Sequence, residues 1–482
     1  MRTSLIIDNV SRLSGSGATF ERRNPVGGAV VSTSAAATAQ DAIAAVESCA
    51  TAFGTWSRSA PAMRRDILLK AGELLDARGH QFIEMMMAET GATKAWCGFN
   101  THLAAGMLRE AAGLTTQVKG EVIPSNKPGM FSMALRRPAG VVLSIAPWNA
   151  PVILAVRSFC TALACGNTVL LKASEFSAGT QYLLAQTMID AGLPPGVLNF
   201  ITHAPQDAGA VAEAMIAHPA VRRVNFTGST RTGRIVAATC AKYLKPVLLE
   251  LGGKAPMLVL ADAEIGHAVR AAAFGSYMHQ GQICMSTERI VIEDSVADAF
   301  VEQLATKARS LTASDPALGE APLGALVDAP SSQRVQSLID DAVAKGAVLC
   351  VAGRTDGAVM GASMLDRVTP EMKIYHEESF GPVACVIRVK DVEEAIRVAN
   401  DTEYGLSSAI FTRDVGRAID IAQRLDFGCC HINGPTVHDE AQMPLGGMKA
   451  SGYGRFGGLP GIHEFTEVQW VSIEDPAQHY PI

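Results

Sequence analysis

Two short stretches of this chain contain the residue types that could carry out covalent chemistry on a carbonyl group. Cys284 stands in the middle of residues 281–287 (Gly-Gln-Ile-Cys-Met-Ser-Thr), and Glu250 stands in residues 249–254 (Leu-Glu-Leu-Gly-Gly-Lys). A cysteine thiolate attacks a carbonyl carbon, and a carboxylate can activate the water that later releases the acyl group. The two residues are 34 positions apart, so only tertiary folding can bring them together. Taken alone, Cys284 is one of ten cysteines, most of which are expected to be small buried side chains.

Length, composition and charge indicate a globular protein that handles small molecules. The 482 residues predict two or three domains, and a content of 48% hydrophobic and 18% charged residues indicates a large core. The net charge of −6 argues against a nucleic-acid partner or an anionic membrane surface. No Cys-x-x-Cys or His-x-x-x-His pattern occurs, and no apolar run approaches ~18 residues, so we expect no metal site and no membrane span. The apolar run at the N-terminus is too short for the core of a signal peptide, so none is expected, and a cytoplasmic location with reduced thiols is expected.

The apolar pattern predicts a helical lead-in followed by a parallel sheet. After a short β-like opening, apolar residues recur at helical spacing over 41–56, 63–77, 81–96 and 101–117, and Gly79 is expected to end the second helix in a left-handed cap. Buried strands are predicted at 141–145, 168–172, 197–202, 223–226 and 247–250, with helices beginning near residues 151, 177, 206 and 233. Such connections force parallel pairing, which predicts a doubly wound, Rossmann-like sheet with its ligand at the carboxyl ends of the strands.

A second α/β unit is predicted after Lys254. Strands are expected near 257–260, 289–292, 348–351, 383–388, 408–411 and 430–432, with helices starting near 263, 296, 333, 392 and 415. Cys284 lies in the loop that opens this unit, so we expect catalysis in a cleft between the two units.

Two further segments have the period-two alternation of strands. Residues 120–124 and 130–136 flank a Pro/Gly turn and predict a hairpin inserted before the parallel sheet, and residues 464–473 predict a C-terminal strand. The edges of such a hairpin have to be paired by another chain or by another part of this one.

A third stretch with chemical potential is 226–233 (Phe-Thr-Gly-Ser-Thr-Arg-Thr-Gly), between a strand and a helix. Gly228 permits a tight turn, Ser229 can cap the helix, and the free amides of the first turn favour pyrophosphate oxygens. The stretch lacks the Lys-Ser/Thr pair of a P-loop and the Gly-x-Gly-x-x-Gly spacing. On its own it fits an ordinary strand-to-helix turn equally well.

Polar residues also follow the strands predicted at 141–145 and 168–172. The side-chain amide of Asn149 can donate to an oxyanion. Lys172 and Glu175 follow the second strand, and a carboxylate there accepts bonds from a ribose 2′-hydroxyl but repels a 2′-phosphate, which favours NAD over NADP. As isolated residues, Asn149 could cap the helix at Pro151, and Lys172 and Glu175 could form a solvated pair.

Together with residues 377–383, 400–406 and 444–452, these stretches resemble the aldehyde dehydrogenase superfamily in family order along essentially the whole chain. The resemblance implies the aldehyde dehydrogenase fold: an α/β protein with a Rossmann-like cofactor-binding domain (1–118 and 139–249), a catalytic domain (250–463) and a β oligomerisation arm (119–138 and 464–482). In this family the arm pairs with a neighbouring subunit, which implies a homodimer or a dimer of dimers.

The resemblance also implies a role for each site residue. Cys284 is the nucleophile, Glu250 the base that activates water, and Asn149 together with the Cys284 amide the oxyanion site. The cofactor is NAD, with NADP possible: Lys172 and Glu175 bind the adenosine ribose, Glu378 holds the nicotinamide ribose and Phe380 lies against the nicotinamide. The full set of cofactor residues is Ile145, Pro147, Trp148, Lys172, Ser174, Glu175, Gly228, Ser229, Leu251, Gly252, Glu378 and Phe380.

Within the superfamily, residues 147–155, 432–444 and 479–482 look most similar to enzymes that oxidise vanillin, then to those that oxidise salicylaldehyde or benzaldehyde, which implies an aromatic aldehyde as substrate. Arg157 lies two helical turns past Asn149, and we hypothesise that it contacts a ring hydroxyl or methoxyl oxygen. The alternative is a surface or interface ion pair. The tunnel positions are Trp96, Leu103, Ala150, Leu154, Arg157, Ile283, Met285, Val437 and His438.

Other functions are weighed against this one. Within the enzyme class, an aliphatic aldehyde or a semialdehyde is the main alternative substrate. A catalytically silent dinucleotide-binding protein would have no reason to contain both Cys284 and Glu250, and a coenzyme-A-acylating dehydrogenase would have no use for Glu250 as a hydrolytic base.

Overall fold

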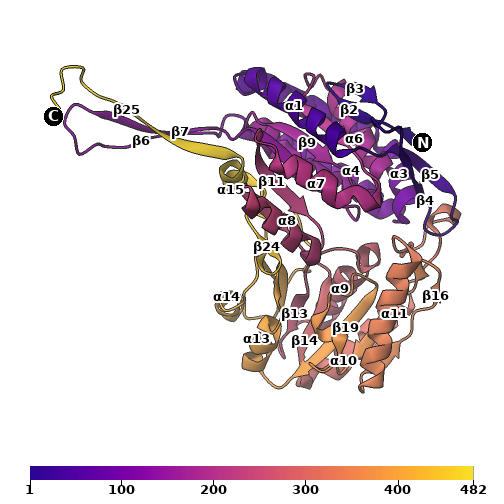
Figure 1. The fold of residues 1–482 in the computed structure, drawn as a ribbon. Helices are drawn as coiled ribbons and strands as arrows, with labels where there is room; N and C mark the ends of the chain where they lie inside the picture. Colours follow the sequence, from indigo (N-terminus) through magenta and orange to yellow (C-terminus); the bar gives the residue numbers. More distant parts are fainter. Residues whose placement is uncertain (481) are drawn as a thin grey trace.

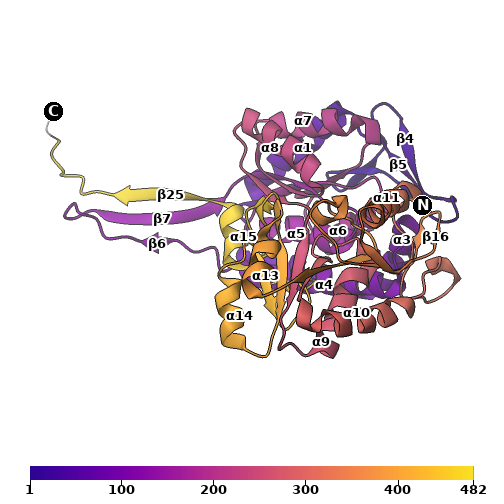
Figure 2. The ribbon, with the colours of Figure 1, turned by 90° about the horizontal axis from the view of Figure 1, so that it is seen from below.

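A long β arm projects from a body made of two α/β units in this computed structural model, which describes residues 1–480 and 482 (Figure 1). The arm pairs β25 with β7 in antiparallel register, from Thr466↔Pro138 to Ile473↔Phe131, and β6 extends the other side of β7. Figure 2 shows the same arm clear of both units. Part of the hairpin edge is therefore paired within this chain. The bounds are β6 (Glu121–Val122), β7 (Phe131–Pro138) and β25 (Thr466–Ile473).

The first unit is built on a sheet with the strand order β24-β12-β11-β8-β9-β10-β2-β3. Neighbouring strands from β12 to β10 are parallel, and the chain order reverses between β8 and β11, which is the switch point of a doubly wound sheet. The bounds are β2 (Leu5–Ile7), β3 (Val10–Arg12), β8 (Val141–Ile145), β9 (Thr168–Lys172), β10 (Leu198–Ile201), β11 (Val221–Thr227), β12 (Val247–Glu250) and β24 (Gly452–Tyr453). The last of these lies far along the chain but pairs with β12, Gly452 opposite Glu250.

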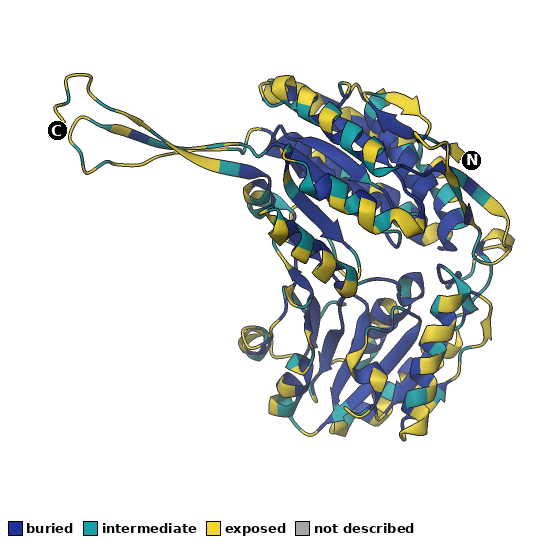
Figure 3. Ribbon diagram, in the orientation of Figure 1, coloured by how far each residue is buried: buried dark blue, intermediate teal, exposed yellow. Residues whose placement is uncertain are grey.

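Helices cover both faces of this sheet, which explains why its central strands are apolar runs without alternation. Figure 3 shows the buried strands between the helix layers. One face packs against α1 (Ala39–Trp56), α7 (Ala208–Ala217) and α8 (Thr230–Lys242). The other packs against α5 (Pro151–Ala164) and α6 (Ala178–Asp190), with α2 (Pro61–Ala77), α3 (Gly79–Thr90) and α4 (Lys94–Leu114) beyond them. A small N-terminal sheet is formed by β1 (Arg2–Thr3), β4 (Thr19–Arg23) and β5 (Val30–Ala35).

The helical lead-in differs from the prediction at two glycines. Gly79 was expected to take a left-handed cap, but Arg78 ends α2 with φ −94° and Gly79 begins α3, so this expectation is wrong. The left-handed residue is Gly91, with φ 70°, which ends α3. The predicted break between residues 96 and 101 is also wrong, because the Thr93 side chain accepts a hydrogen bond from the Trp96 amide and starts α4 there.

Three other boundaries shift. The helix expected near residue 233 begins at Thr230, directly after its cap Ser229. A short 3-10 turn, Pro205–Asp207, precedes α7. The C-terminal strand begins at Thr466 rather than 464, because α15 (Gly458–Glu464) includes Glu464.

The second unit contains a sheet with the order β15-β18-β19-β14-β13-β21-β22, parallel except for the pair β15 and β18. Helices α9 (Ile265–Tyr277) and α10 (Asp294–Arg309) pack on one face. The other face holds α11 (Ala329–Ala344), α12 (Lys373–His376), α13 (Val392–Asn400) and α14 (Val415–Ala422). The strands are β13 (Ala255–Val259), β14 (Thr287–Glu293), β15 (Val348–Val351), β18 (Ser363–Asp366), β19 (Val383–Val389), β21 (Ser407–Phe411) and β22 (Cys429–Ile432).

Short elements complete this unit. Hairpin β16 (Thr355–Asp356) with β17 (Val359–Met360) and the pair β20 (Tyr404–Gly405) with β23 (Met448–Lys449) lie outside the main sheet, as do the 3-10 turns Met278–Gly281 and Pro316–Leu318. In the described part of the chain, none of the helices combines the length and the apolar character needed to cross a bilayer.

Candidate active site

A cavity of about 450 Å³ brings Cys284, Glu250 and Asn149 together. Glu250 is the last residue of β12, Asn149 precedes α5, and Cys284 lies between the end of α9 and the start of β14. The cavity therefore lies where the carboxyl ends of the first sheet meet the second unit, as the sequence predicts.

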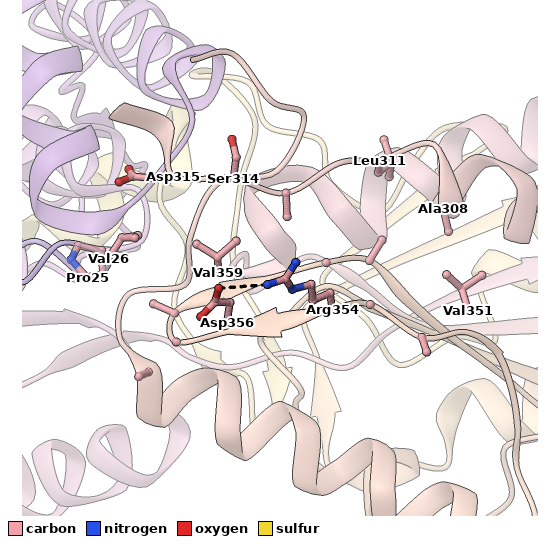
Figure 4. A pocket seen from close by; sticks show the side chains of 18 of the residues that line it. Pro25, Val26, Ala308, Leu311, Ser314, Asp315, Val351, Arg354, Asp356 and Val359 are labelled. Carbon is pink, nitrogen blue, oxygen red and sulfur yellow. Dashed lines mark ion pairs between the residues drawn. The ribbon is translucent and has the colours of Figure 1, made fainter. Parts of the chain in front are cut away.

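A larger groove, of about 800 Å³, lies elsewhere (Figure 4). It runs between Pro25 and Val26 of the N-terminal segment and the β16–β17 hairpin. Its residues Arg354 and Asp356 form an ion pair with each other, and none of the predicted catalytic residues lines it. The size of a depression is therefore a poor guide to the active site in this chain.

The loop that contains Cys284 is held in an uncommon backbone conformation. The two residues before Gly281, His279 and Gln280, have left-handed φ values of 51° and 55°, and the Gln280 side chain donates to the carbonyl of Ala325 at 2.8 Å. The Cys284 carbonyl then packs directly against Gly253, where an added Cβ would lie 2.1 Å from that oxygen. Only glycine permits this approach, which joins the nucleophile loop to the loop after Glu250.

The environment raises the proton affinity of both reactive groups. Burial raises the pKa of the Cys284 thiol, and the carboxylates of Glu250 and Glu378 raise it further, whereas Arg157 lowers it. Burial also raises the pKa of Glu250 to about 7, with Arg157 and Arg455 opposing the shift. Among the described residues, Glu250 Oε1 has no hydrogen-bond partner. A carboxyl group with this pKa and a free oxygen can exchange protons with water at neutral pH.

Asn149 lies beside the nucleophile loop. Its Nδ2 donates to the carbonyl of Gln282 at 2.9 Å, and Trp96 Nε1 donates to the Asn149 carbonyl at 3.0 Å. The alternative that Asn149 caps α5 is wrong, because Ala150 is the cap residue and no side chain bonds there. Within the described chain the Cys284 amide donates no hydrogen bond. The second Nδ2 hydrogen and this amide are donors suited to an oxyanion.

The predicted cofactor residues follow the carboxyl edge of the first sheet. Ser229 Oγ accepts from the Thr232 amide at 3.3 Å and caps α8, so this stretch is a strand-to-helix turn with a free helix N-terminus. Gly228 donates to the carbonyl of Glu250 at 3.0 Å. Leu251 packs on Gly233, where a Cβ would lie 2.3 Å from its Cδ2. The phosphate-loop candidate thus contacts the strand that carries the base.

The loops that follow β8 and β9 carry the other predicted cofactor residues at this edge of the sheet. Burial lowers the pKa of Lys172, and the Glu175 charge opposes this shift without an ion pair between the two in the described part of the chain, which contradicts the solvated-pair alternative. Gln181 links the two loops, accepting from the Ser174 amide and donating to the Pro147 carbonyl, each at 3.0 Å. Lys172 and Glu175 therefore keep donors and acceptors that fit the two hydroxyls of a ribose.

Residues predicted to hold the nicotinamide half also converge. Glu378 Oε1 accepts from the Gly253 amide at 2.9 Å, and a Cβ on Gly252 would lie 2.7 Å from the other Glu378 oxygen. Burial, reinforced by Glu288, raises the pKa of Glu378 to about 7. The rings of Trp148 and Phe380 meet edge to face at 5.8 Å. Ile145, the last residue of β8, is buried in the core of the first sheet.

The cavity wall includes the residues predicted for the substrate tunnel, except Leu103, which packs against the neighbouring core. Sequence reasoning missed Phe99, although it lies three residues from Trp96 on the same face of α4 and helical spacing would have found it. It also missed Asp439, for which the sequence carries no local signal. The wall consists of Trp96, Phe99, Ala150, Ile153, Leu154, Arg157, Thr227, Phe274, Met278, Ile283, Met285, Leu406, Pro435, Val437, His438, Asp439 and Leu445 beside the three catalytic candidates.

Arg157 forms an ion pair inside this cavity rather than at a surface. Its Nη2 donates to Asp439 Oδ1 at 2.6 Å and also to Oδ2, and the two side chains are only 8% and 10% exposed. Burial alone lowers the pKa of Arg157, but Asp439 reverses this and raises it. Among the described residues, Nε and Nη1 of Arg157 have no hydrogen-bond acceptor, so the guanidinium retains donors for a ligand. His438 instead pairs with Glu440 at 2.9 Å.

The described part of the chain contains no group of three or more His, Cys, Asp or Glu side chains that could hold a metal ion. The ten cysteines are all free thiols.

Known proteins are similar to this chain over nearly its whole length. The model of the aldehyde dehydrogenase family matches residues 13–471. A vanillin dehydrogenase of Pseudomonas fluorescens is 59% identical over 478 residues, which cover 99% of each chain. The crystal structure of a salicylaldehyde dehydrogenase from Pseudomonas putida G7, complexed with salicylaldehyde, has a TM-score of 0.98 at 48% identity and covers 100% of both chains. A betaine aldehyde dehydrogenase from Staphylococcus aureus in complex with NAD+ has a TM-score of 0.94 at 30% identity, over 99% of this chain and 95% of that one.

The carboxyl edge of this doubly wound sheet meets a half-buried cysteine and a buried carboxylate, an arrangement typical of the oxidoreductases that act on an aldehyde with a nicotinamide cofactor. This chain belongs to the aldehyde dehydrogenase family. The predicted fold class, the enzyme class and the similarity to the aromatic branch of the family are confirmed.

Proposed function

We propose that this enzyme oxidises an aromatic aldehyde of the vanillin type to its carboxylic acid, with NAD as the hydride acceptor. The observation that carries the proposal is the cavity that holds Cys284, Glu250 and Asn149 and is otherwise lined mainly by apolar and aromatic side chains. Trp96 and Phe99 stack on each other at 5.6 Å and place aromatic surface in the cavity wall. The names of the vanillin and salicylaldehyde dehydrogenase relatives support the same substrate class.

The residues divide the reaction into two steps. Cys284 Sγ, once deprotonated, adds to the aldehyde carbon, and the oxygen that becomes negative is held by Asn149 Nδ2 and the Cys284 amide. A nicotinamide ring, when bound, supplies the acceptor for the hydride. The product on Cys284 is a thioester. Glu250 then takes a proton from water, the water oxygen adds to the thioester carbon, and the thiolate of Cys284 leaves with release of the acid.

NAD is proposed over NADP because Glu175 lies in the loop that follows β9. A carboxylate accepts bonds from a free 2′-hydroxyl and repels a 2′-phosphate. Lys172 is close enough to feel the Glu175 charge, which opposes the effect of burial on the lysine pKa. We assign cofactor binding to residues 1–118 and 139–249, and the nucleophile to the catalytic domain 250–463.

A panel of aldehydes tests this function. Purified protein should reduce NAD with vanillin, salicylaldehyde and benzaldehyde at higher kcat/KM than with short-chain aldehydes or semialdehydes, and more slowly with NADP. A preference for an aliphatic aldehyde would contradict the aromatic substrate, and a preference for NADP would contradict the role of Glu175. A larger kcat/KM for salicylaldehyde than for vanillin would favour the second candidate, which the salicylaldehyde-complexed neighbour supports.

Arg157→Ala is expected to lower kcat/KM more for vanillin than for benzaldehyde. The difference should be about tenfold, because one hydrogen bond from a charged donor to a ring oxygen is lost only with the substituted ring. A loss common to both aldehydes is also expected, since Arg157 lowers the pKa of both Cys284 and Glu250.

Two further variants serve as controls for this measurement. Arg157→Ala/Asp439→Asn removes the carboxylate charge that the single variant leaves buried, and it should show the same difference between aldehydes. Leu103→Ala, outside the cavity wall, should affect both aldehydes alike. If kcat/KM fell equally for vanillin and benzaldehyde in the Arg157 variants, the proposed contact between Arg157 and a ring oxygen would be contradicted.

We also propose that the arm joins two copies of the chain. Apolar side chains on it are exposed, among them Phe131, Leu135, Val468 and Trp470, the last at 72%. Such a surface is costly in water unless another protein covers it. A homodimer or a dimer of dimers in the cytoplasm, where the ten free thiols would stay reduced, fits these features.

A further inference from the structure

Lys254 and Glu288 form the most deeply buried ion pair in the described part of the chain, with side chains only 0% and 3% exposed. Lys254 Nζ lies 2.7 Å from Glu288 Oε2. Lys254 follows Glu250 by four residues and Glu288 follows Cys284 by four, so this contact joins the two catalytic stretches. A buried ion pair adds little net stability, because desolvation of the charges offsets their attraction. Stability alone therefore does not account for its presence here.

The Glu288 carboxylate also binds the loop that follows Glu378. It accepts from the Ser379 amide at 3.1 Å, the Ser379 hydroxyl at 2.6 Å and the Phe380 amide at 3.0 Å. With Lys254, these donors use the acceptor capacity of a carboxylate fully. Phe380 has a left-handed φ of 46°, which is costly for a bulky residue and persists only where the surroundings impose it. Glu288 supplies that constraint by accepting from two successive amides.

We propose that Glu288, with its charge balanced by Lys254, is a positioning residue for the cofactor. It fixes the backbone of residues 378–380 so that the Glu378 carboxylate and the Phe380 ring face the nicotinamide half of the bound dinucleotide. The inference rests on the proposed function in assigning Glu378 and Phe380 to the cofactor. Arg334 assists from the other side of the loop, where its Nη1 donates to the Glu378 carbonyl at 3.0 Å.

The physical consequence of losing the carboxylate falls on the loop. Two amides that point into a dry interior would lose their acceptor, and an unpaired buried N–H is costly enough for the loop to rearrange. Phe380 would then relax from its left-handed conformation and move with Glu378. Cofactor affinity should fall, while the aldehyde cavity, which contains neither Glu288 nor residues 378–380, keeps its shape.

Glu288→Gln tests the proposal. Glutamine has nearly the same shape but is uncharged and keeps only one acceptor oxygen, so it cannot hold the Ser379 amide, the Ser379 hydroxyl, the Phe380 amide and Lys254 together. Calorimetric titration without aldehyde should show a Kd for NAD raised by about tenfold or more, the expected effect of losing hydrogen bonds to a charged acceptor. The KM for NAD should rise in parallel, and the KM for the aldehyde should stay unchanged.

A second variant and a control separate positioning from folding. Lys254→Met/Glu288→Gln removes the lysine charge that Glu288→Gln leaves unpaired. The double variant should therefore have a higher Tm than Glu288→Gln but bind NAD as weakly as that single variant. Asp366→Asn breaks another buried pair in the same unit, Asp366 with Arg388 at 2.8 Å, away from residues 378–380. It should lower Tm and leave the Kd for NAD unchanged.

The proposal would be overturned if folded Glu288→Gln and the double variant bound NAD with the affinity of the parent. It would also be overturned if Asp366→Asn raised the Kd for NAD as much as Glu288→Gln does. These titrations contain no aldehyde, so they are independent of the substrate. A parent protein that binds NAD but oxidises no aromatic aldehyde would refute the proposed substrate and leave this inference intact.

Discussion

Cys284→Ala should abolish NAD reduction by aromatic aldehydes, with kcat/KM lowered by roughly 10⁴-fold or more, the scale on which a lost nucleophile is felt. Cys284 is the one cysteine in the cavity wall of the described chain, and the wall offers no other group of comparable nucleophilicity. The variant should bind NAD with the affinity of the parent, because the Cys284 side chain lines the aldehyde cavity and is not among the residues assigned to the cofactor. NADH formation followed by absorbance, with NAD titration alongside, checks both parts.

Cys429→Ala is the matched control for that variant. Cys429 lies on β22, is partly buried against the same core cluster, and its pKa is raised by burial and then by Glu250, yet it does not line the cavity. Turnover of Cys429→Ala should resemble that of the parent. Full turnover by Cys284→Ala, or an equal loss in Cys429→Ala, would contradict the assignment of the nucleophile.

The scaffold could be predicted because its central strands are short apolar runs bounded by loops. Helices cover both faces of the sheet, so β8 and β9 are mostly apolar and show no alternation of polar and apolar residues. Asn149 and Lys172 follow or end these strands, where the carboxyl ends of parallel strands meet. The helix boundaries in the lead-in were harder to predict. Its apolar periodicity continues across Gly91 to Thr93, and the cap signal at Thr93 decides the boundary. Trp96 was assigned to the substrate tunnel from the family resemblance, and Phe99 fell in the predicted break between two helices.

Contacts between distant segments were beyond sequence reasoning. Arg157 meets Asp439 across 282 residues, and nothing in the spacing of either marks the pair. Lys254 ends the stretch that contains Glu250, and Glu288 directly follows the stretch that contains Cys284, but nothing in the sequence indicates that they pair. Helical or strand periodicity shows which face a residue occupies, and it cannot show which side chain from another element fills the space opposite. The left-handed pair His279 and Gln280 is likewise imposed by tertiary contacts.

Glu250→Gln should stop the reaction after its first half. Hydride departure from the Cys284 adduct requires the oxyanion donors, whereas release of the acid requires a base for water, and glutamine cannot accept that proton. Rapid mixing should therefore show a burst of NADH close to one per active site, followed by a steady rate lowered by about 10³-fold. Mass spectrometry should find the acyl group on Cys284. Turnover without a burst, at the parental rate, would contradict the role of Glu250.

The pH dependence of the same variant supplies an independent check. The pKa of Glu250 is raised to about 7 by burial, so the parental rate of acid release should increase with pH and level off above that value, whereas the variant should lack this titration. The contribution of Glu250 to the free energy of unfolding should instead decrease as pH rises. A carboxyl whose folded pKa exceeds its unfolded value binds its proton more tightly when folded, so its contribution is present at low pH and is lost as pH rises through the folded pKa. Above that pH, Glu250→Gln should be more stable than the parent by roughly 3 kcal/mol, and the difference should vanish in acid. Chemical denaturation at both pH values measures this, and a variant that is both inactive and less stable above neutral pH would show that Glu250 supports the structure rather than the chemistry.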